Sequence, residues 1–199
     1  MEGTYQNVFL EAIDRTLKFK MELPNEDLGF LGKAQKAFSN TDNVKGVFTH
    51  VHRSLGGFTA EDLKGACIKY GILAKPYFEN YLDTKAVLTV GYVIDNGTEL
   101  YKFGDTEINN LIRRMPEKYT KAVVHVWLTL PSFEIIDLTY LESKRNLAGL
   151  PFNEEIGFSY VFESVENLYL KQRLVYCPML VGVDSLFKLG LASLVNNEA

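Results

Sequence analysis

Two short apolar segments, separated by only two residues, constrain the fold of this chain most strongly. Residues 122–130 and 133–139 are rich in β-branched and apolar side chains, and a Pro-Ser dipeptide separates them. Such side chains fit the pleated surface of a buried strand, and so short a connection is typical of antiparallel neighbours. The pattern predicts a hairpin that places His125 of the first strand beside Asp137 of the second.

Further segments predict an α+β fold with helices packed against an antiparallel sheet. Residues 86–94 read as a strand, and the Asn-Gly turn that follows is a strong hairpin signal. Further strands are predicted at residues 44–53, 99–103, 158–162 and 174–183. Helical spacing of apolar side chains predicts helices at residues 5–21, 106–115 and 185–195, with a short helix within 26–43.

Length and charge narrow the classes of function. The 199 residues suit a single domain spanning 1–199. A net charge of −4 gives no general attraction for nucleic acid or for an anionic membrane. The first residues lack the layout of a secretory signal, and no apolar run approaches the ~20 residues that cross a bilayer. We therefore expect a cytoplasmic protein with no nucleic-acid or membrane partner.

Cys67 stands at a predicted helix start. Thr59 and Asp62 have the spacing of a capping box, and Gly65 can end that first helical turn, so that Cys67 opens the next helix. The free N–H groups and the dipole of a helix start favour a thiolate. Pro76 is expected to kink the second helix or to end it early.

The order of thiol, imidazole and carboxylate fits nucleophilic catalysis. A thiolate attacks a carbonyl, an imidazole takes and returns the proton, and a carboxylate orients the ring. The alternative for Cys67 is a small buried hydrophobic residue. Cys177 precedes a proline and is interpreted as structural, and both thiols are expected to be free in a reducing compartment.

These residues resemble a known family. The pattern comprises residues 65–67 before a helix, 90–93 in a strand, 125–127 and 135–139. It is similar to the core of the transglutaminase-like, papain-related cysteine superfamily, over residues 54–141. The family usually has proline at the position of Leu138 and often an aromatic or acidic residue at that of Ile68. The resemblance leaves residues 142–199 as a C-terminal elaboration of the core.

The resemblance implies thiol-dependent acyl chemistry on an amide. Cys67 would be the nucleophile, His125 the general base and then acid, and Asp137 the orienting group. The backbone N–H of Cys67 would be one oxyanion donor. Hydrolysis of a peptide or isopeptide bond is the first choice and transfer to an amine the second. Such a peptidase, amidase or acyltransferase takes a peptide or another amide as substrate and needs no cofactor and no metal.

Two further residues are candidates for substrate binding. Trp127 shares a strand face with His125, so it either walls the site or fills the core. In papain-related enzymes a glutamine upstream of the cysteine can donate to the oxyanion, and Gln35 is the nearest upstream candidate.

Two other classes of function remain open. On a strand, His50 and His52 would share a face, and with His125 they would make a three-histidine zinc site. Alternatively, these two histidines are a partly exposed strand face near a loop. The other class is a binding module that kept the fold and lost the reaction.

Overall fold

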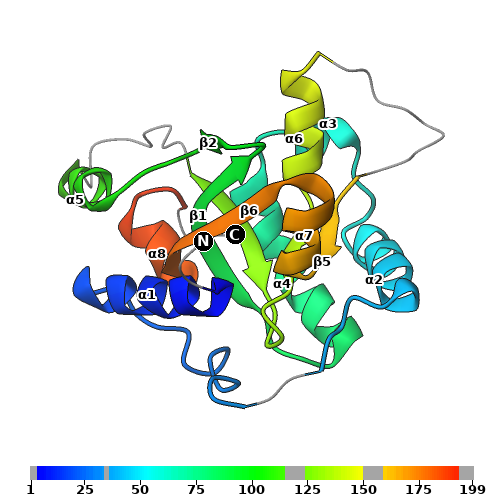
Figure 1. Cartoon of the computed structure of the whole chain (residues 1–199), viewed down its shortest axis with the longest axis horizontal. Helices are drawn as coiled ribbons and strands as arrows, with labels where there is room; N and C mark the ends of the chain where they lie inside the picture. The colour runs from blue at the N-terminus through cyan, green and yellow to red at the C-terminus, as the bar shows by residue number, and fades with distance from the viewer. Residues whose placement is uncertain (1–3, 34–35, 115–123, 150–158, 193–199) are drawn as a thin grey trace, which may run out of the picture.

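The chain folds as helices packed around an antiparallel sheet, in a computed structural model (Figure 1). The structure describes residues 4–33, 36–114, 124–149 and 159–192. The mixed architecture predicted from the sequence is thereby confirmed. Within these ranges, no helix is long and apolar enough to cross a membrane.

The described strands form one sheet, and the pairings between them are antiparallel. The strands are β1 (Val87–Asp95), β2 (Thr98–Leu100), β3 (His125–Thr129), β4 (Ile135–Asp137), β5 (Val161–Glu163) and β6 (Leu174–Val181). Their order is β2-β1-β3-β4-β5, and β6 also pairs with β1. Most residues of β1 that pair with β2 or β3 also pair with β6. Strand β6 therefore lies along one edge of β1, and β2 and β3 lie along the other edge.

Both predicted hairpins are present. Asn96 and Gly97 have φ values of 49° and 83°, the left-handed conformation that a two-residue turn between β1 and β2 requires. In the second hairpin Leu128 of β3 lies opposite Ile136 of β4. The two hairpins set the registers of the strands that carry the candidate site.

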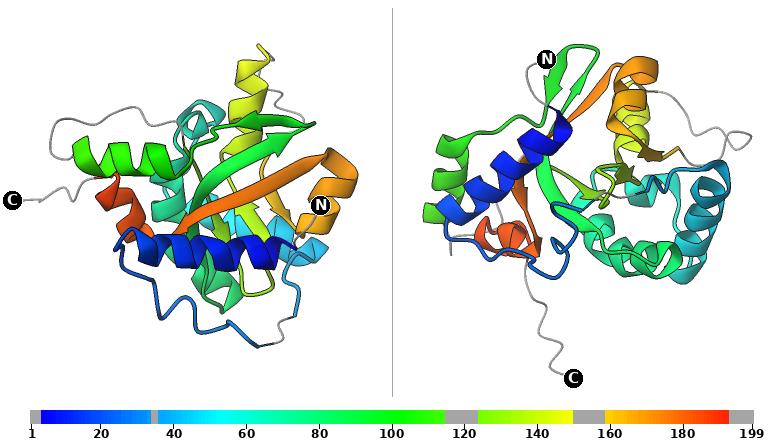
Figure 2. Two further views of the ribbon diagram at one scale, coloured as in Figure 1. Left: turned by 60° about the vertical axis from the view of Figure 1, so that its left-hand side comes forward. Right: turned by 60° about the horizontal axis from the view of Figure 1, so that its bottom comes forward.

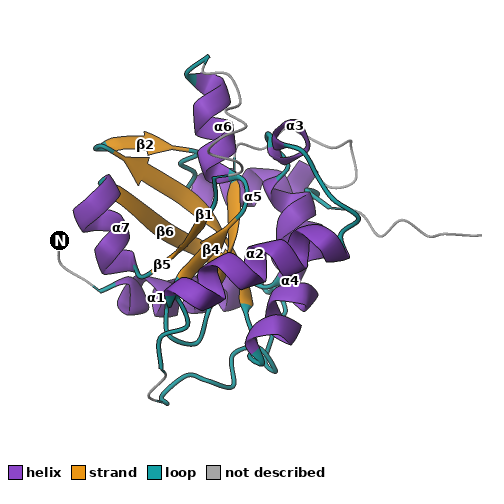
Figure 3. Ribbon diagram, turned by 90° about the vertical axis from the view of Figure 1, so that its right-hand side faces the viewer, coloured by secondary structure: helices purple, strands orange, loops and turns teal. Residues whose placement is uncertain are grey.

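Helices cover the sheet on several sides. They are α1 (Tyr5–Lys18), α2 (Thr41–Ser54), α3 (Ala60–Leu63), α4 (Cys67–Leu82), α5 (Asp105–Arg114), α6 (Tyr140–Leu147), α7 (Val165–Gln172) and α8 (Val183–Lys188). Helix α1 lies along β6 (Figures 1 and 2). Helices α2 and α4 lie side by side (Figure 3), and α4 packs against β3.

The side chains of β3 point alternately into two hydrophobic clusters. Val126 and Leu128 pack with α4 and α2, whereas Trp127 belongs to a separate cluster with β4, β6 and α7. Gly71 of α4 allows a close approach, because a Cβ there would lie 2.9 Å from Cγ1 of Val126. The helix that begins at Cys67 is therefore packed tightly against the strand that begins at His125.

The predicted strand at residues 44–53 is wrong, because this segment belongs to α2. The side chain of Asn40 caps the helix by accepting a hydrogen bond from the backbone N–H of Asn43. Val47 and Val51 are fully buried, and their spacing of four residues is that of a helix face. The apparent alternation of the segment concealed this helical period.

Other differences are smaller. Of the two effects expected of Pro76, an early end of α4 does not occur, since the helix continues to Leu82; a kink there stays a prediction. Pro76 is exposed, so the carbonyl group that loses its helical hydrogen bond can be hydrated. The short helix expected within 26–43 is instead a series of turns over residues 25–32, followed by the start of α2. Helices α6 and α7 were not predicted.

Candidate active site

Cys67 is the first residue of α4, as the sequence predicts. The side chain of Thr59 accepts a hydrogen bond from the N–H of Asp62, whose carboxylate accepts one from the N–H of Thr59, so a capping box begins α3. Gly65 has a φ of 64°, a conformation that favours glycine. This break between α3 and α4 leaves Cys67 at a helix start, where N–H groups lack helical partners.

The sulfur of Cys67 lies at the beginning of β3. Its thiol donates to the carbonyl oxygen of Val124, with Sγ 3.8 Å from that oxygen. Cys67 is also close enough to His125 to contribute to the raised pKa of the imidazole. Cys67 is half-buried and free of any disulfide. The thiol and the imidazole are therefore neighbours in the fold.

His125 and Asp137 form a buried pair. Nε2 of His125 lies 2.5 Å from Oδ2 of Asp137, and their side chains are only 3% and 1% exposed. Because the carboxylate occupies Nε2, Nδ1 is the ring nitrogen that remains for the thiol of Cys67. The predicted hairpin thus joins these two residues across neighbouring strands.

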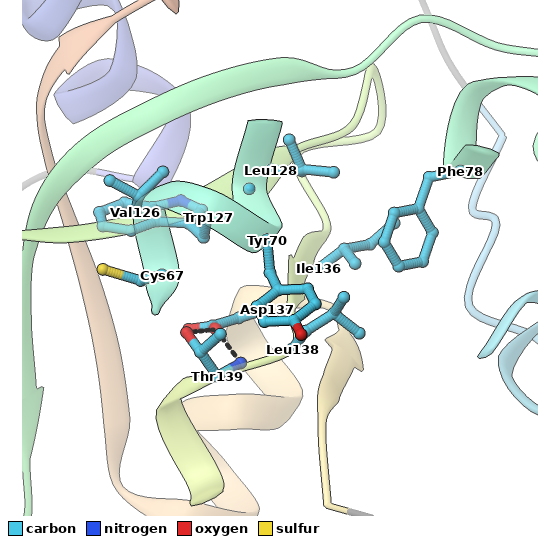
Figure 4. Close-up of a pocket in the computed structure, with 11 residues that line it drawn as sticks. Cys67, Tyr70, Phe78, Val126, Trp127, Leu128, Ile136, Asp137, Leu138 and Thr139 are labelled. Atoms are coloured by element: carbon cyan, nitrogen blue, oxygen red, sulfur yellow. Dashed lines mark hydrogen bonds between the residues drawn. The ribbon is translucent and has the colours of Figure 1, made fainter. Parts of the chain in front are cut away.

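Asp137 is held by more than the imidazole. Its Oδ1 accepts hydrogen bonds from the backbone N–H groups of Thr139 (2.9 Å) and Tyr140 (3.0 Å). Its Oδ2 accepts one from the hydroxyl of Tyr176, at 2.9 Å. Figure 4 shows the bonds to Thr139 beside Cys67. The carboxylate is fixed by donors from the start of α6 and from β6.

The pair carries opposite charges around neutral pH. Burial lowers the pKa of His125, but the charge and hydrogen bond of Asp137, with a contribution from Cys67, raise it overall to about 10. Burial raises the pKa of Asp137, but the charge of His125 and three hydrogen bonds hold that pKa below its usual value. The imidazolium is therefore oriented and stabilised by a carboxylate.

Aromatic rings enclose His125. Its ring stacks on that of Tyr101, with centroids 5.4 Å apart. Three other rings contact it at centroid distances of 6.1, 5.6 and 6.4 Å, from Trp127, Tyr140 and Tyr176. Together with the burial of His125, this enclosure limits the access of water to the imidazole.

Trp127 lies behind the imidazole in the core. It is 1% exposed, and its indole N–H donates to the hydroxyl of Tyr5 at 2.9 Å. That hydroxyl also shares a hydrogen bond with Thr129, which in turn bonds Thr89. Of the two roles expected for Trp127, filling the core matches this burial, and substrate contact stays a prediction.

The space directly between the start of α4 and strands β3 and β4 is small. Cys67, Gly71, Val126 and Asp137 line a cavity of about 10 Å³ there (Figure 4). This volume accepts no more than a water-sized molecule. A substrate must therefore reach Cys67 from another side.

Gln35, the predicted oxyanion donor, lies outside the described residues. The backbone N–H of Cys67, the other predicted donor, belongs to the first turn of α4, where donors are free.

The structure does not bring the three histidines together. Residues two apart on a helix point in different directions. His50 contacts Tyr81, with ring centroids 5.4 Å apart, and Nε2 of His52 lies 3.1 Å from the carbonyl oxygen of Phe58. Among the described residues, no group of three His, Cys, Asp or Glu side chains is placed to hold a metal ion.

Sequence reasoning missed the tyrosines around His125. Tyr140 follows Asp137 closely, and a carboxylate just before a helix is a capping signal that could have placed it. Tyr101 lies in the segment between β2 and α5, and Tyr176 lies in β6. No local sequence pattern marks either of them as a neighbour of the imidazole.

Comparisons with known proteins add no family. No family model, no curated protein and no solved structure matches this chain. The resemblance to transglutaminase-like and papain-related enzymes therefore stays a prediction from the sequence.

Proposed function

We propose that the protein carries out thiol-dependent acyl chemistry on an amide bond, with Cys67 as nucleophile. One observation carries this proposal. The thiol at the start of α4 adjoins an imidazole whose far nitrogen is held by a buried carboxylate. Nucleophile, base and orienting group in this order are the arrangement that nucleophilic catalysis requires.

Each side chain has a defined step. The proposed step starts from the thiolate of Cys67 and the imidazolium of His125. The thiolate attacks the carbonyl carbon, and a carbon–sulfur bond forms. The protonated His125 gives its proton to the amide nitrogen, the carbon–nitrogen bond breaks, and the amine leaves. Water then attacks the thioester, His125 takes a proton from it, the carbon–sulfur bond breaks, and the acid leaves with the thiolate and the imidazolium restored. Asp137 keeps the ring oriented throughout.

The electrostatics of the pair support these roles. With a pKa of about 10, His125 is protonated near neutral pH and can serve as the acid of the first half-reaction. The charged carboxylate of Asp137 stabilises that imidazolium. The backbone N–H of Cys67 is the proposed oxyanion donor, because the first N–H groups of a helix have no helical partner.

Transfer of the acyl group to an amine is the second candidate. The four aromatic rings around His125 favour it, because they limit the approach of water to the base. Whether water or an amine reaches the thioester decides the product. Both candidates share the first half-reaction.

Alkylation of the two cysteines tests the proposal. The intact protein is treated with iodoacetamide at pH 7, and peptide mass spectrometry gives the rate at each cysteine. We expect Cys67 to react at least about tenfold faster than Cys177, since an imidazole adjoins only the former. A p-nitrophenyl acyl ester should also leave an acyl group on Cys67, with release of p-nitrophenol.

The Cys67→Ser variant is the matched control for the ester. It should release no burst of p-nitrophenol, whereas Cys177→Ser should release the same burst as the unchanged protein. Slow and equal alkylation of the two cysteines, with no acyl adduct, would contradict the proposal and favour an inactive binding module.

A further inference from the structure

A surface hollow is lined by two of the aromatic residues that contact His125, Tyr101 and Tyr140. Its volume is about 380 Å³, within the range of small-molecule and side-chain pockets. Its lining includes Asp95, Leu100, Tyr101, Tyr140, Lys144 and Ala148. We call it the Tyr101 hollow. The β1–β2 hairpin forms one wall, and α6 forms the other.

Two of its walls are also walls of the candidate active site. The ring of Tyr101 stacks on that of His125, at 5.4 Å and an interplanar angle of 21°. Tyr140 meets the same imidazole edge-on, with centroids 5.6 Å apart. A single layer of aromatic rings therefore separates the hollow from His125.

The backbone holds Tyr101 in this position at a cost. Its φ is 64°, in the left-handed region where a bulky side chain is disfavoured. The charges of Cys67 and Asp137 also raise the pKa of its hydroxyl, after the larger effect of burial. Tyr101 thus faces the catalytic groups on one side and the hollow on the other.

The polar base of the hollow is electrically neutral. Oδ2 of Asp95 lies 2.5 Å from Nζ of Lys144 and accepts a hydrogen bond from the hydroxyl of Tyr140 at 2.6 Å. Its Oδ1 accepts one from the side chain of Asn96 at 2.7 Å. Asp95 is buried and Lys144 is about half exposed. The carboxylate of Asp95 and the ammonium group of Lys144 thus form an ion pair at the base of the hollow.

This base disfavours a charged ligand of either sign. Because Asp95 and Lys144 neutralise each other, neither is a free counter-charge for a ligand, and a charged ligand would lose hydration without gaining a partner. Of the other lining residues, Leu100, the ring of Tyr101 and Ala148 are apolar, and Asn96 and Thr98 are polar but uncharged. An uncharged apolar or aromatic side chain fits both properties.

We propose that the Tyr101 hollow binds an uncharged apolar or aromatic side chain of the substrate, next to the carbonyl group that Cys67 attacks. This inference rests on the proposed function and names the substrate class of that site. The substrate side chain would stack on the ring of Tyr101, which itself stacks on His125. The binding energy of this contact would position the carbonyl group of the substrate near the catalytic groups.

Electrophilic probes of different side chain test the inference. N-acetyl chloromethyl ketones of glycine, phenylalanine, aspartate and lysine each alkylate a thiol, with formation of a sulfur–carbon bond and loss of chloride. Their second-order rates at Cys67 are measured by mass spectrometry. We expect the phenylalanine probe to react about 10- to 100-fold faster than the glycine probe, as burial of such a side chain allows. The aspartate and lysine probes should not exceed the glycine probe.

Variants of the hollow sharpen the test. Ala148 is exposed at the end of α6, so Ala148→Trp fills the hollow without burying a new side chain in the core. The rate ratio of the phenylalanine probe to the glycine probe should fall to near one. Leu170→Trp, on the exposed face of α7, is the matched control and should keep the ratio of the unchanged protein.

Lys144→Gln tests the neutral base. The change leaves Asp95 without its cation, so the lysine probe should become faster than the aspartate probe. Lys144→Arg should restore similar rates for the two charged probes. These results would show that the ion pair, rather than the size of the hollow alone, excludes charge.

Two failures are distinguishable. If Cys67 and Cys177 react equally slowly with iodoacetamide, the proposed function itself is wrong. If Cys67 is selectively reactive but all four probes react alike, or Ala148→Trp leaves their ratios unchanged, only the inference about the Tyr101 hollow is overturned.

Discussion

The two cysteines of this chain differ in their neighbours and resemble each other in exposure. Both are free and half-buried. Cys67 opens α4 beside His125, whereas Cys177 lies within β6, opposite Tyr92 of β1. Burial raises the pKa of the Cys177 thiol, and a hydrogen bond with Tyr92 only partly offsets this.

The two thiols therefore differ in their partners rather than in their accessibility, and only Cys67 has the surroundings that the proposed reaction needs. A thiol in an apolar strand becomes harder to ionise, and one beside an imidazolium at a helix start becomes easier to use. Each of the following changes acts on the surroundings of Cys67 and spares those of Cys177.

Replacing the imidazole should have the largest effect. His125→Ala removes the proposed base, so alkylation of Cys67 should slow by about 10²-fold or more, the usual contribution of such a group. Alkylation of Cys177 should not change. Peptide mass spectrometry with iodoacetamide measures both rates in one sample.

His50→Ala is the matched control for this change. His50 lies on α2 and contacts Tyr81, so both rates should stay as in the unchanged protein. If His50→Ala slowed Cys67 as strongly as His125→Ala, the pairing of Cys67 with His125 would be refuted.

Asp137→Asn should cost the most stability. Removing one partner of a buried ion pair typically destabilises a protein by about 3–5 kcal/mol, and the neutral amide would leave the imidazolium of His125 without its counter-ion. Urea unfolding at pH 7 measures the loss. Asp105→Asn, which removes an exposed carboxylate bonded to Arg15 and Lys18, should cost only about 0–1 kcal/mol.

A rise in pH should lower the stability by a similar amount. The pKa of His125 rises from its ordinary 6.5 to about 10 on folding, so its contribution to the free energy of unfolding is full below pH 6.5. That contribution is lost as pH rises through 10. The loss should be of the same order as that of Asp137→Asn, because both changes remove the attraction between the imidazolium and the carboxylate.

Urea unfolding between pH 6 and 10 checks this dependence. The difference in unfolding free energy between the unchanged protein and His125→Ala should shrink steadily across that range. Other groups that titrate there are common to both proteins and cancel in the difference. A constant difference would mean that His125 is not the titrating group.

Gly71→Ala should have the smallest effect. The new Cβ would lie 2.9 Å from Cγ1 of Val126, so α4 must shift from β3, at about 1–3 kcal/mol. The helix gains up to about 1 kcal/mol from losing glycine. We expect a small net loss in urea unfolding and slower alkylation of Cys67 alone. Gly29→Ala, where a Cβ makes only an ordinary 3.5 Å contact, should change neither.

Local signals made much of the site predictable from the sequence. The capping pair of Thr59 and Asp62, the break at Gly65 and the short connection between β3 and β4 each act within a few residues. Together they place Cys67 at a helix start and His125 beside Asp137. These features depend on backbone chemistry that the sequence displays directly.

The features that the sequence did not predict correctly depend on tertiary packing. Residues 44–53 alternate like a strand, but the burial of Val47 and Val51 against α4 decides for a helix. This correction also separates His50 from His52. The enclosure of His125 by tyrosines depends on tertiary packing of distant segments, which no short pattern encodes.

The chain of hydrogen bonds from Trp127 to Tyr5 reaches the first turn of α1. Trp127, which contacts the imidazole of His125, is thereby hydrogen-bonded to Tyr5, a residue 122 positions earlier in the chain. Proteolytic trimming past Tyr5, or a fusion partner that unwinds the first turn of α1, should loosen the imidazole while leaving the three proposed catalytic side chains chemically intact.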